Sequence, residues 1–163
     1  MLAPAIRYKN KIMEEFQKLV YTDDMMLVTG CLEQWIPKIP DNPGQGEFNY
    51  AIVDSNDNCI GYFAFQVDYY ARKAYNFGLM SFDRGNPIVG LDVFHKLEEL
   101  VKYMHRVEWR AVEGNPACRG YDKFISIHGG NKIILRDSVR DKYGNYRDDF
   151  IYEIVNKGGD LYD

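Results

Sequence analysis

Hydrophobic and polar positions follow different periods along the middle of the chain, and the changes of period separate strands from helices. Ala74–Phe82 is an apolar, aromatic run that predicts a buried strand. After a break at Asp83–Pro87, apolar side chains recur at helical spacing as far as His105. This stripe consists of Val93, Phe94, Leu97, Leu100, Val101 and Met104. Arg106–Val112 then alternates and predicts a half-buried strand, so the whole unit is expected to be a parallel βαβ crossover.

The segments before this unit predict a helix and a hairpin. Tyr8–Val20 has an apolar stripe at helical spacing, whereas Asp23–Trp35 fits either a helix or a strand. Phe48–Val53 and Cys59–Asp68 are joined by a polar turn, which predicts an antiparallel hairpin. With Ala74–Phe82 as a third strand, the hairpin becomes a meander.

The segments after the crossover predict another helix and a closing hairpin. Pro116–His128 has one apolar face and ends at Gly129, as helices often do. Lys132–Val139 and Asp149–Val155 form the last hairpin, and the tail Lys157–Asp163 is expected to be flexible. We therefore expect a single α+β domain over residues 1–163. Its sheet should be mixed and mostly antiparallel, with a central parallel βαβ crossover flanked by helices.

Composition narrows the range of partners. The chain has 163 residues, of which 46% are hydrophobic and 27% charged, as in ordinary globular proteins. A net charge of −4 without a basic block argues against nucleic acid. No apolar run could span a membrane, and the start MLAPAIRYKNK lacks signal-peptide order, so a cytoplasmic protein is expected. The cysteines and histidines are scattered, so no metal site is expected.

The loop after the first crossover strand is the first candidate for ligand contact. A helix N-terminus favours anions because its first amides are unpaired and its dipole is positive. Asn86 suits the N-cap of this helix and Pro87 its first position. The sequence therefore suggests a ligand that carries phosphate.

Three features together resemble the GCN5-related N-acetyltransferase superfamily. A strand leads through Arg84–Gly85 into a long helix, and another strand ends at Asn115 before a short helix that contains Tyr121. The third feature is the Gly144–Asp148 pattern in the closing hairpin, which is similar to the branch that acetylates N-terminal amines of ribosomal proteins. The resemblance covers about residues 48–155.

The resemblance implies a function and a set of site residues. It implies acetyl-CoA as co-substrate, no metal, and acetyl transfer to a primary amine of a small molecule or peptide in a ternary complex. Tyr121 would protonate the leaving thiolate, and a homodimer is one expected assembly. The implied cofactor-binding residues are Met80, Phe82, Arg84, Gly85, Asn86, Ile88, Val89, Gly90 and Asn115.

Residue chemistry adds candidates for the individual steps. A backbone N–H near Met80 would polarise the thioester carbonyl. A tyrosine with an ordinary pKa of about 10 is protonated at neutral pH and can donate. Glu113, near the end of its strand, is the candidate general base, ahead of Asp83.

Other interpretations stay open at this point. Pro87 and Val89 stand where the family loop carries glycine, which suggests a catalytically silent acyl-CoA-binding or protein-interaction module of the same fold. An unrelated mixed fold with fully paired central strands is a further alternative. At single positions, Tyr121 also fits a core residue, Asn115 a helix cap and Glu113 a structural carboxylate.

Overall fold

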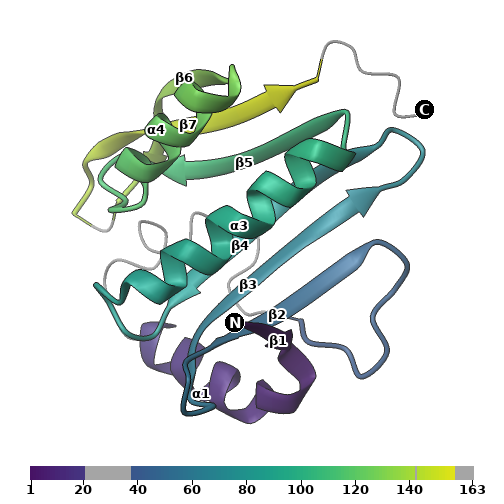
Figure 1. Cartoon of the computed structure of the whole chain (residues 1–163). Coiled ribbons are helices and arrows are strands. Elements are labelled where there is room, and N and C mark those ends of the chain that lie inside the picture. Colours follow the sequence, from purple (N-terminus) through teal and green to yellow (C-terminus); the bar gives the residue numbers. More distant parts are fainter. Residues whose placement is uncertain (21–37, 142, 157–163) are drawn as a thin grey trace.

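A mixed β-sheet forms the centre of the structure, a computed structural model that describes residues 1–20, 38–141 and 143–156 (Figure 1). Its seven described strands lie in the order β1-β2-β3-β4-β5-β7-β6. They are β1 (Leu2–Pro4), β2 (Glu47–Val53), β3 (Cys59–Asp68), β4 (Lys73–Ser81), β5 (Arg106–Val112), β6 (Asn131–Arg140) and β7 (Tyr146–Val155). Neighbours run antiparallel except β4 and β5, which are parallel. The predicted α+β class with a central parallel crossover is therefore confirmed.

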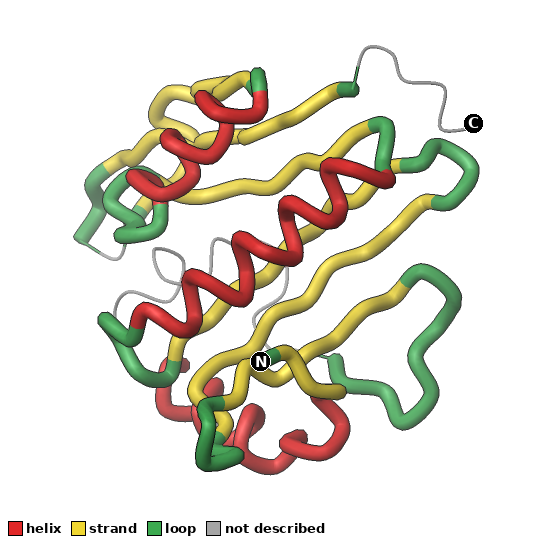
Figure 2. Tube along the Cα trace, viewed as in Figure 1, coloured by secondary structure: helices red, strands yellow, loops and turns green. Residues whose placement is uncertain are grey.

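Helices cover both faces of this sheet. They are the 3₁₀ helix η1 (Ala5–Tyr8) and the α-helices α1 (Lys9–Val20), α3 (Pro87–Tyr103) and α4 (Cys118–His128). The buried side chains of α3 and α4 belong to one apolar cluster and those of α1 to another, so α1 lies on the opposite face. Figure 2 shows α3 and α4 in front of the strands.

Sequence periodicity locates most of these elements to within two residues. The helix expected from Tyr8 begins at Lys9 after η1, and the helix expected from Pro116 begins at Cys118. Strand β1 gives no sequence signal because three residues are too few to show a period. The predictions for Asp23–Trp35 and for the tail Lys157–Asp163 lie outside the described residues.

The larger apolar core lies between the sheet and the α3–α4 layer. The stripe of α3 enters it through Val93, Leu97 and Leu100, which are buried. Phe94, Val101 and Met104 are only partly buried against it. The Trp109 ring of β5 stacks on Tyr152 of β7, with ring centroids 5.6 Å apart. Trp109 also contacts Phe124 of α4, and Phe124 contacts Phe94 of α3, so aromatic packing links both helices to the sheet.

The smaller core lies beneath α1. Ile12 and Phe16 on the inner face of this helix pack with Val53, Tyr62 and Met80 from three strands. Phe16 and Tyr62 meet edge to face, with ring centroids 5.7 Å apart. Burial of this inner face holds α1 on the sheet.

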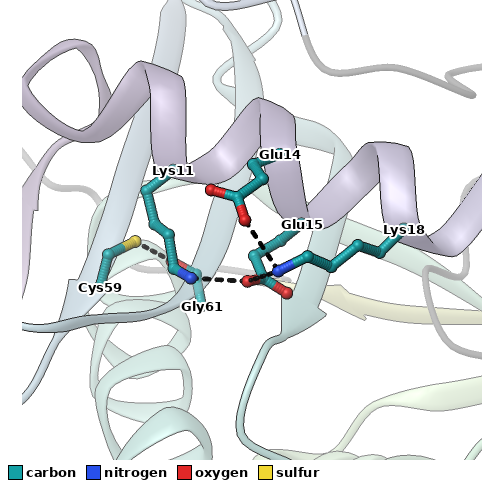
Figure 3. Close-up of polar contacts among 6 residues, drawn as sticks. All are labelled: Lys11, Glu14, Glu15, Lys18, Cys59 and Gly61. Carbon is teal, nitrogen blue, oxygen red and sulfur yellow. Dashed lines mark hydrogen bonds and ion pairs between the residues drawn. The ribbon is translucent and has the colours of Figure 1, made fainter.

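Ion pairs between neighbouring turns follow the flank of α1 that lies beside β3 (Figure 3). The Nζ of Lys11 lies 2.6 Å from Glu15, and the Nζ of Lys18 lies 2.9 Å from Glu15 and 3.0 Å from Glu14. Hydrogen bonds from these lysines lower the pKa of Glu15. Because exposed ion pairs contribute little to stability, apolar burial rather than this ladder determines where α1 lies. Below the ladder, the buried thiol of Cys59 donates to the Gly61 carbonyl at 3.5 Å.

The glycines that end α4 offer a test of the packing beneath it. Gly129 has φ 68°, and a Cβ added there would meet no atom within 4 Å. A Cβ added at Gly130 would lie 2.5 Å from the Glu153 carbonyl oxygen and 2.9 Å from Cβ of Ile125. We expect Gly129→Ala to lower the free energy of unfolding by about 1 kcal/mol and Gly130→Ala by about 2–3 kcal/mol. Urea unfolding measures both changes. If Gly130→Ala lowered the free energy of unfolding by less than Gly129→Ala does, β7 would be able to move away from the added Cβ without loss of stability.

Candidate active site between the diverging strands

Strands β4 and β5 separate soon after they meet, and the opening between them is the centre of the candidate site. Their parallel pairing joins Lys73 to Arg106 and Ala74 to Val107, and it goes no further in the described ladder. Both strands then continue, spreading apart toward their carboxyl ends (Figure 2). An unrelated fold with fully paired central strands does not fit this geometry.

A distortion in β4 coincides with the separation. Asn76 adopts φ 53°, in the left-handed region. The register of β4 against β3 shifts at the same level, between Ala64 and Gln66. Such bulges bend a strand and increase its twist. We infer that the bulge directs the second half of β4 away from β5.

A cavity of about 340 Å³ lies between the two strand ends. Its walls come from β3, β4, the loop before α3, α3 itself, β5 and the start of α4. The lining residues are Phe63, Phe77, Leu79, Ser81, Arg84, Gly85, Asn86, Val89, Gly90, Val93, Leu97, Trp109, Arg110, Asn115, Pro116, Ala117 and Tyr121. The loop after β4 and the Asn115 turn, which are 30 residues apart in sequence, therefore border one cavity.

The first turn of α3 forms one end of this cavity. Asn86 is the N-cap and Pro87 the first helical residue, as predicted. The side-chain oxygen of Asn86 accepts a hydrogen bond from the Ile88 amide at 3.0 Å, so this amide is not free for a ligand. The next amide, that of Val89, has no acceptor within the helix because it belongs to the first turn. This end of the helix retains a positive dipole and at least one unpaired donor.

Two glycines leave open space above this turn. Gly85 has φ 88°, and a Cβ added at Gly85 or at Gly90 would meet no atom within 4 Å. The Val89 side chain is only 5% exposed and belongs to the apolar core. Arg84 lies beside the glycines in the cavity wall and is exposed. The residues present therefore fit an anionic group such as a phosphate.

The backbone of β4 directs particular amides into the opening. The Phe82 amide donates to the Ile60 carbonyl at 2.9 Å, and Met80 lies opposite Tyr62 in the ladder with β3. Because N–H groups alternate sides along a strand, Met80 and Phe82 face β3, and the amides of Leu79 and Ser81 face the opening. Strand β5 offers these two amides no partner, because the pairing between β4 and β5 ends at Ala74 and Val107.

Asn115 turns the chain from β5 into α4. Its side-chain oxygen accepts from the Ala117 amide at 2.9 Å, and its carbonyl accepts from the Cys118 amide at 3.0 Å. The N-cap of α4 is Ala117, so the prediction of Asn115 as a helix cap is wrong; its side-chain oxygen instead closes a turn onto Ala117 just before the helix. Within the described chain its side-chain NH₂ group has no partner, and the residue lines the cavity.

Tyr121 projects from the inner face of α4 into the same space. Its ring contacts Phe94, Trp109 and Tyr152, with centroids 5.9, 5.6 and 5.4 Å away. Burial raises its pKa above the usual value, so the hydroxyl is protonated at neutral pH. No hydrogen bond within the described chain engages that hydroxyl. Tyr121 is thus a buried core residue that also lines the cavity, and its role as the acid stays a prediction.

The charges in the cavity wall are all positive. Among the described lining residues, the charged side chains are Arg84 and Arg110. Arg110 of β5 forms an ion pair with Oδ2 of Asp149 in β7. Asp149 is fully buried, and its Oδ1 has no hydrogen-bond partner among the described residues. Because Asp149 offsets the charge of Arg110, the uncompensated positive charge in this wall is that of Arg84.

Five predicted site residues lie outside the cavity lining. The side chains of Met80 and Phe82 pack in the core beneath α1, and Ile88 packs partly against the larger core. Glu113 is exposed, and its carboxylate accepts from the Asp148 amide at 3.3 Å. Asp83, the second candidate base, accepts from Asn86 Nδ2 at 2.8 Å. The structure brings none of these five side chains to the cavity.

Sequence reasoning overlooked other parts of the wall. The alternation of Arg106–Val112 marks Trp109 as core and Arg110 as polar, but it does not place either residue beside a cavity. Ser81 and Leu79 likewise carry no local signal, since their exposure to the opening depends on where β5 leaves β4. These residues can be recognised only from the positions of β4 and β5, two strands that are far apart in the sequence.

Two further observations concern the described residues alone. No group of three or more histidine, cysteine, aspartate or glutamate side chains there could hold a metal ion. None of the described helices combines the length and apolarity needed to cross a bilayer.

Solved structures of acetyltransferases have a similar fold. The crystal structure of spermidine/spermine N-acetyltransferase SpeG from Vibrio cholerae, in complex with manganese ions, aligns with a TM-score of 0.54. The alignment covers 90% of this chain and 74% of that chain at 16% identity. A chimera of Vibrio cholerae spermidine N-acetyltransferase SpeG and hSSAT gives a TM-score of 0.55 over 90% and 78% of the chains at 17% identity. A probable acetyltransferase gives 0.52 over 68% and 63% at 17% identity.

These likenesses concern the fold. No family model and no curated protein matches the sequence. The predicted acyltransferase fold is confirmed, because the mixed sheet and its flanking helices match those of the acetyltransferase structures.

Proposed function

We propose that this single domain is an acetyl-CoA-dependent N-acetyltransferase that acts on a primary amine. The observation that carries the proposal is the cavity between β4 and β5, bounded by the α3 N-terminus, the Asn115 turn and Tyr121. The acetyltransferases that share the fold include enzymes named for spermidine, which supports an amine as acceptor at a general level. The ribosomal-protein branch, a homodimer and a cytoplasmic location stay predictions.

The proposal assigns the two ends of the cavity to the two ends of the cofactor. The Val89 amide, Arg84 and the space above Gly85 and Gly90 would hold the pyrophosphate. The inward amides of β4, from Leu79 and Ser81, would pair with the pantetheine arm or with the thioester oxygen. The resemblance implies the backbone around Leu79–Phe82 for the pantetheine arm, with Met80 and Phe82 as the predicted residues; because the amides of these two face β3, we propose Leu79 and Ser81 in their place. The side-chain NH₂ of Asn115 would add a donor from the opposite wall.

Few groups are needed for the chemistry. When bound, acetyl-CoA would supply an acetyl thioester that a neutral amine attacks directly in a ternary complex, so a C–N bond forms, the C–S bond breaks and the thiol is released. Backbone N–H groups of β4 would stabilise negative charge on the carbonyl oxygen. Tyr121 would give its phenolic proton to the departing sulfur, since its hydroxyl is protonated at neutral pH and makes no hydrogen bond within the described chain. Holding both substrates in the cavity would supply much of the remaining rate enhancement.

The attacking amine must lose a proton, and none of the described cavity-lining residues is proposed to accept it. Glu113 stays the predicted base. Its carboxylate lies outside the lining and is engaged by the Asp148 amide, so it would act through water. Glu113→Gln should therefore have a smaller effect on kcat than a change at Tyr121.

The proposal predicts saturable binding of acetyl-CoA followed by release of thiol in the presence of an acceptor. Calorimetric titration of the full chain with acetyl-CoA measures the first step. A screen of polyamines, aminoglycosides and short peptides, read by released CoA thiol, measures the second. Lack of binding at millimolar acetyl-CoA would contradict the proposal. Binding without transfer to any amine would favour the silent module, for which the proline at position 87 and the capped Ile88 amide provide a rationale.

A further inference from the structure

Arg110 connects the cavity to the opposite face of the sheet. Its neighbours in β5, Trp109 and Ala111, belong to the core beneath α3 and α4. Because side chains alternate along a strand, the Arg110 side chain lies on the other face. Arg110 nevertheless lines the cavity, so the opening between β4 and β5 extends to that face. The Arg110 side chain is 42% exposed, so a second substrate can reach it from the side opposite α3.

The guanidinium of Arg110 is held in position and keeps free donors. The buried Asp149 carboxylate engages one of its terminal nitrogens. Its side chain is 42% exposed, and the described chain gives it no other hydrogen bond. A guanidinium carries five N–H donors in a planar fork that matches a carboxylate. The residue is therefore arranged to bind a second, external anion.

The two cavity arginines lie on different walls. Arg84 is in the loop before α3, beside the amides and glycines suited to phosphate. Arg110 is on β5, with its side chain on the other face, so it is not part of that group. No carboxylate is present among the described lining residues to attract a polyamine. An acceptor that carries only positive charge would therefore find no carboxylate partner in this lining.

We infer that Arg110 binds a carboxylate of the acceptor, so that the preferred substrate is an amine bearing its own carboxylate, as in a free amino acid. This inference rests on the proposed function. The fork of Arg110 would orient such an acceptor from the side opposite α3, with its amine directed into the opening. Asp149 acts through Arg110 as a positioning residue.

Matched pairs of acceptors test the inference with the full-length protein and acetyl-CoA. The pairs are phenylalanine with phenylethylamine, tyrosine with tyramine, and lysine with cadaverine; each second member lacks the carboxylate. We expect kcat/KM, from initial rates of thiol release, to be about tenfold higher or more for the carboxylate-bearing member of at least one pair. Equal or better use of the decarboxylated member in every pair that reacts would overturn the inference and leave acetyl transfer intact. Absence of transfer to all six amines would count against the proposed function, and the inference would fall with it.

Variants test whether the preference for a carboxylate-bearing acceptor depends on Arg110. Arg110→Gln alone leaves the buried Asp149 charge unpaired and endangers folding, so it is combined with Asp149→Asn. In this double variant the ratio of kcat/KM between the two members of a pair should fall to about one, mainly through a higher KM for the amino acid. Circular dichroism should report an intact fold. Arg119→Gln is the control, because Arg119 is exposed on α4 without a partner in the described chain and outside the cavity lining. It should keep the preference. A double variant that folds and keeps the wild-type preference would overturn the inference.

Arg84 provides a second comparison within the cavity. Arg84→Gln should raise the Kd for acetyl-CoA and keep the ratio between the two members of each acceptor pair. The reverse pattern, with an altered acceptor ratio and unchanged acetyl-CoA affinity, would assign the acceptor carboxylate to Arg84 and overturn the role of Arg110.

Discussion

Tyr121→Phe is expected to lower kcat by about 100-fold or more, because it removes the one proposed proton donor to the leaving thiolate. The affinity for acetyl-CoA should stay close to that of the unchanged protein. The ring remains in contact with Phe94, Trp109 and Tyr152, and the described chain makes no hydrogen bond to the lost hydroxyl. Thiol release gives kcat with the best acceptor, and calorimetry gives the Kd for acetyl-CoA.

Tyr152→Phe is the matched control. Tyr152 is also buried, its ring lies 5.4 Å from that of Tyr121, and it is not among the cavity-lining residues. Removal of its hydroxyl should change kcat by less than about twofold, as expected of a group that touches no substrate. A similar small effect for Tyr121→Phe would restrict Tyr121 to the core interpretation.

Trp109→Ala is expected to cause the largest loss of stability, about 3–5 kcal/mol. The indole is 3% exposed and contacts four aromatic rings, those of Phe77, Tyr121, Phe124 and Tyr152. Its removal leaves a void where β4, β5, β7 and α4 meet. For a chain of 163 residues this loss corresponds to a fall in Tm of about 10 °C. Thermal and urea unfolding measure it, and acetyl-CoA affinity should fall as well because Trp109 lines the cavity.

Two comparisons separate packing from other effects at Trp109. Trp109→Phe keeps part of the ring contacts and should lose less than half as much stability as Trp109→Ala. Tyr70→Ala removes a fully exposed ring and should change the free energy of unfolding by less than about 0.5 kcal/mol. A loss below about 1 kcal/mol for Trp109→Ala would show that the neighbouring rings close over the void, contrary to the close packing described here.

Local sequence was sufficient for the elements whose form depends on neighbours a few residues away. The Asn86–Pro87 start of α3 is an example, because its capping bond reaches only to Ile88. The buried stripe of α3 and the alternation of β5 follow in the same way from the periods of helices and strands. Gly129 ends α4 because its left-handed conformation needs only the absence of a side chain. These features could be predicted because their causes are short-range.

The site itself depends on long-range placement. Leu79 and Ser81 offer their amides only because β5 leaves β4 after Val107, and no pattern within β4 reports that departure. Arg110 reaches the cavity through the same opening, and its fixed position needs Asp149, which is 39 residues away. The sequence by itself determined which segments form helices and strands and which faces they bury, since those choices rest on local periodicity. The tertiary structure alone decided which backbone groups and charges meet across the opening, because strand pairing and its interruption join residues that share no local signal.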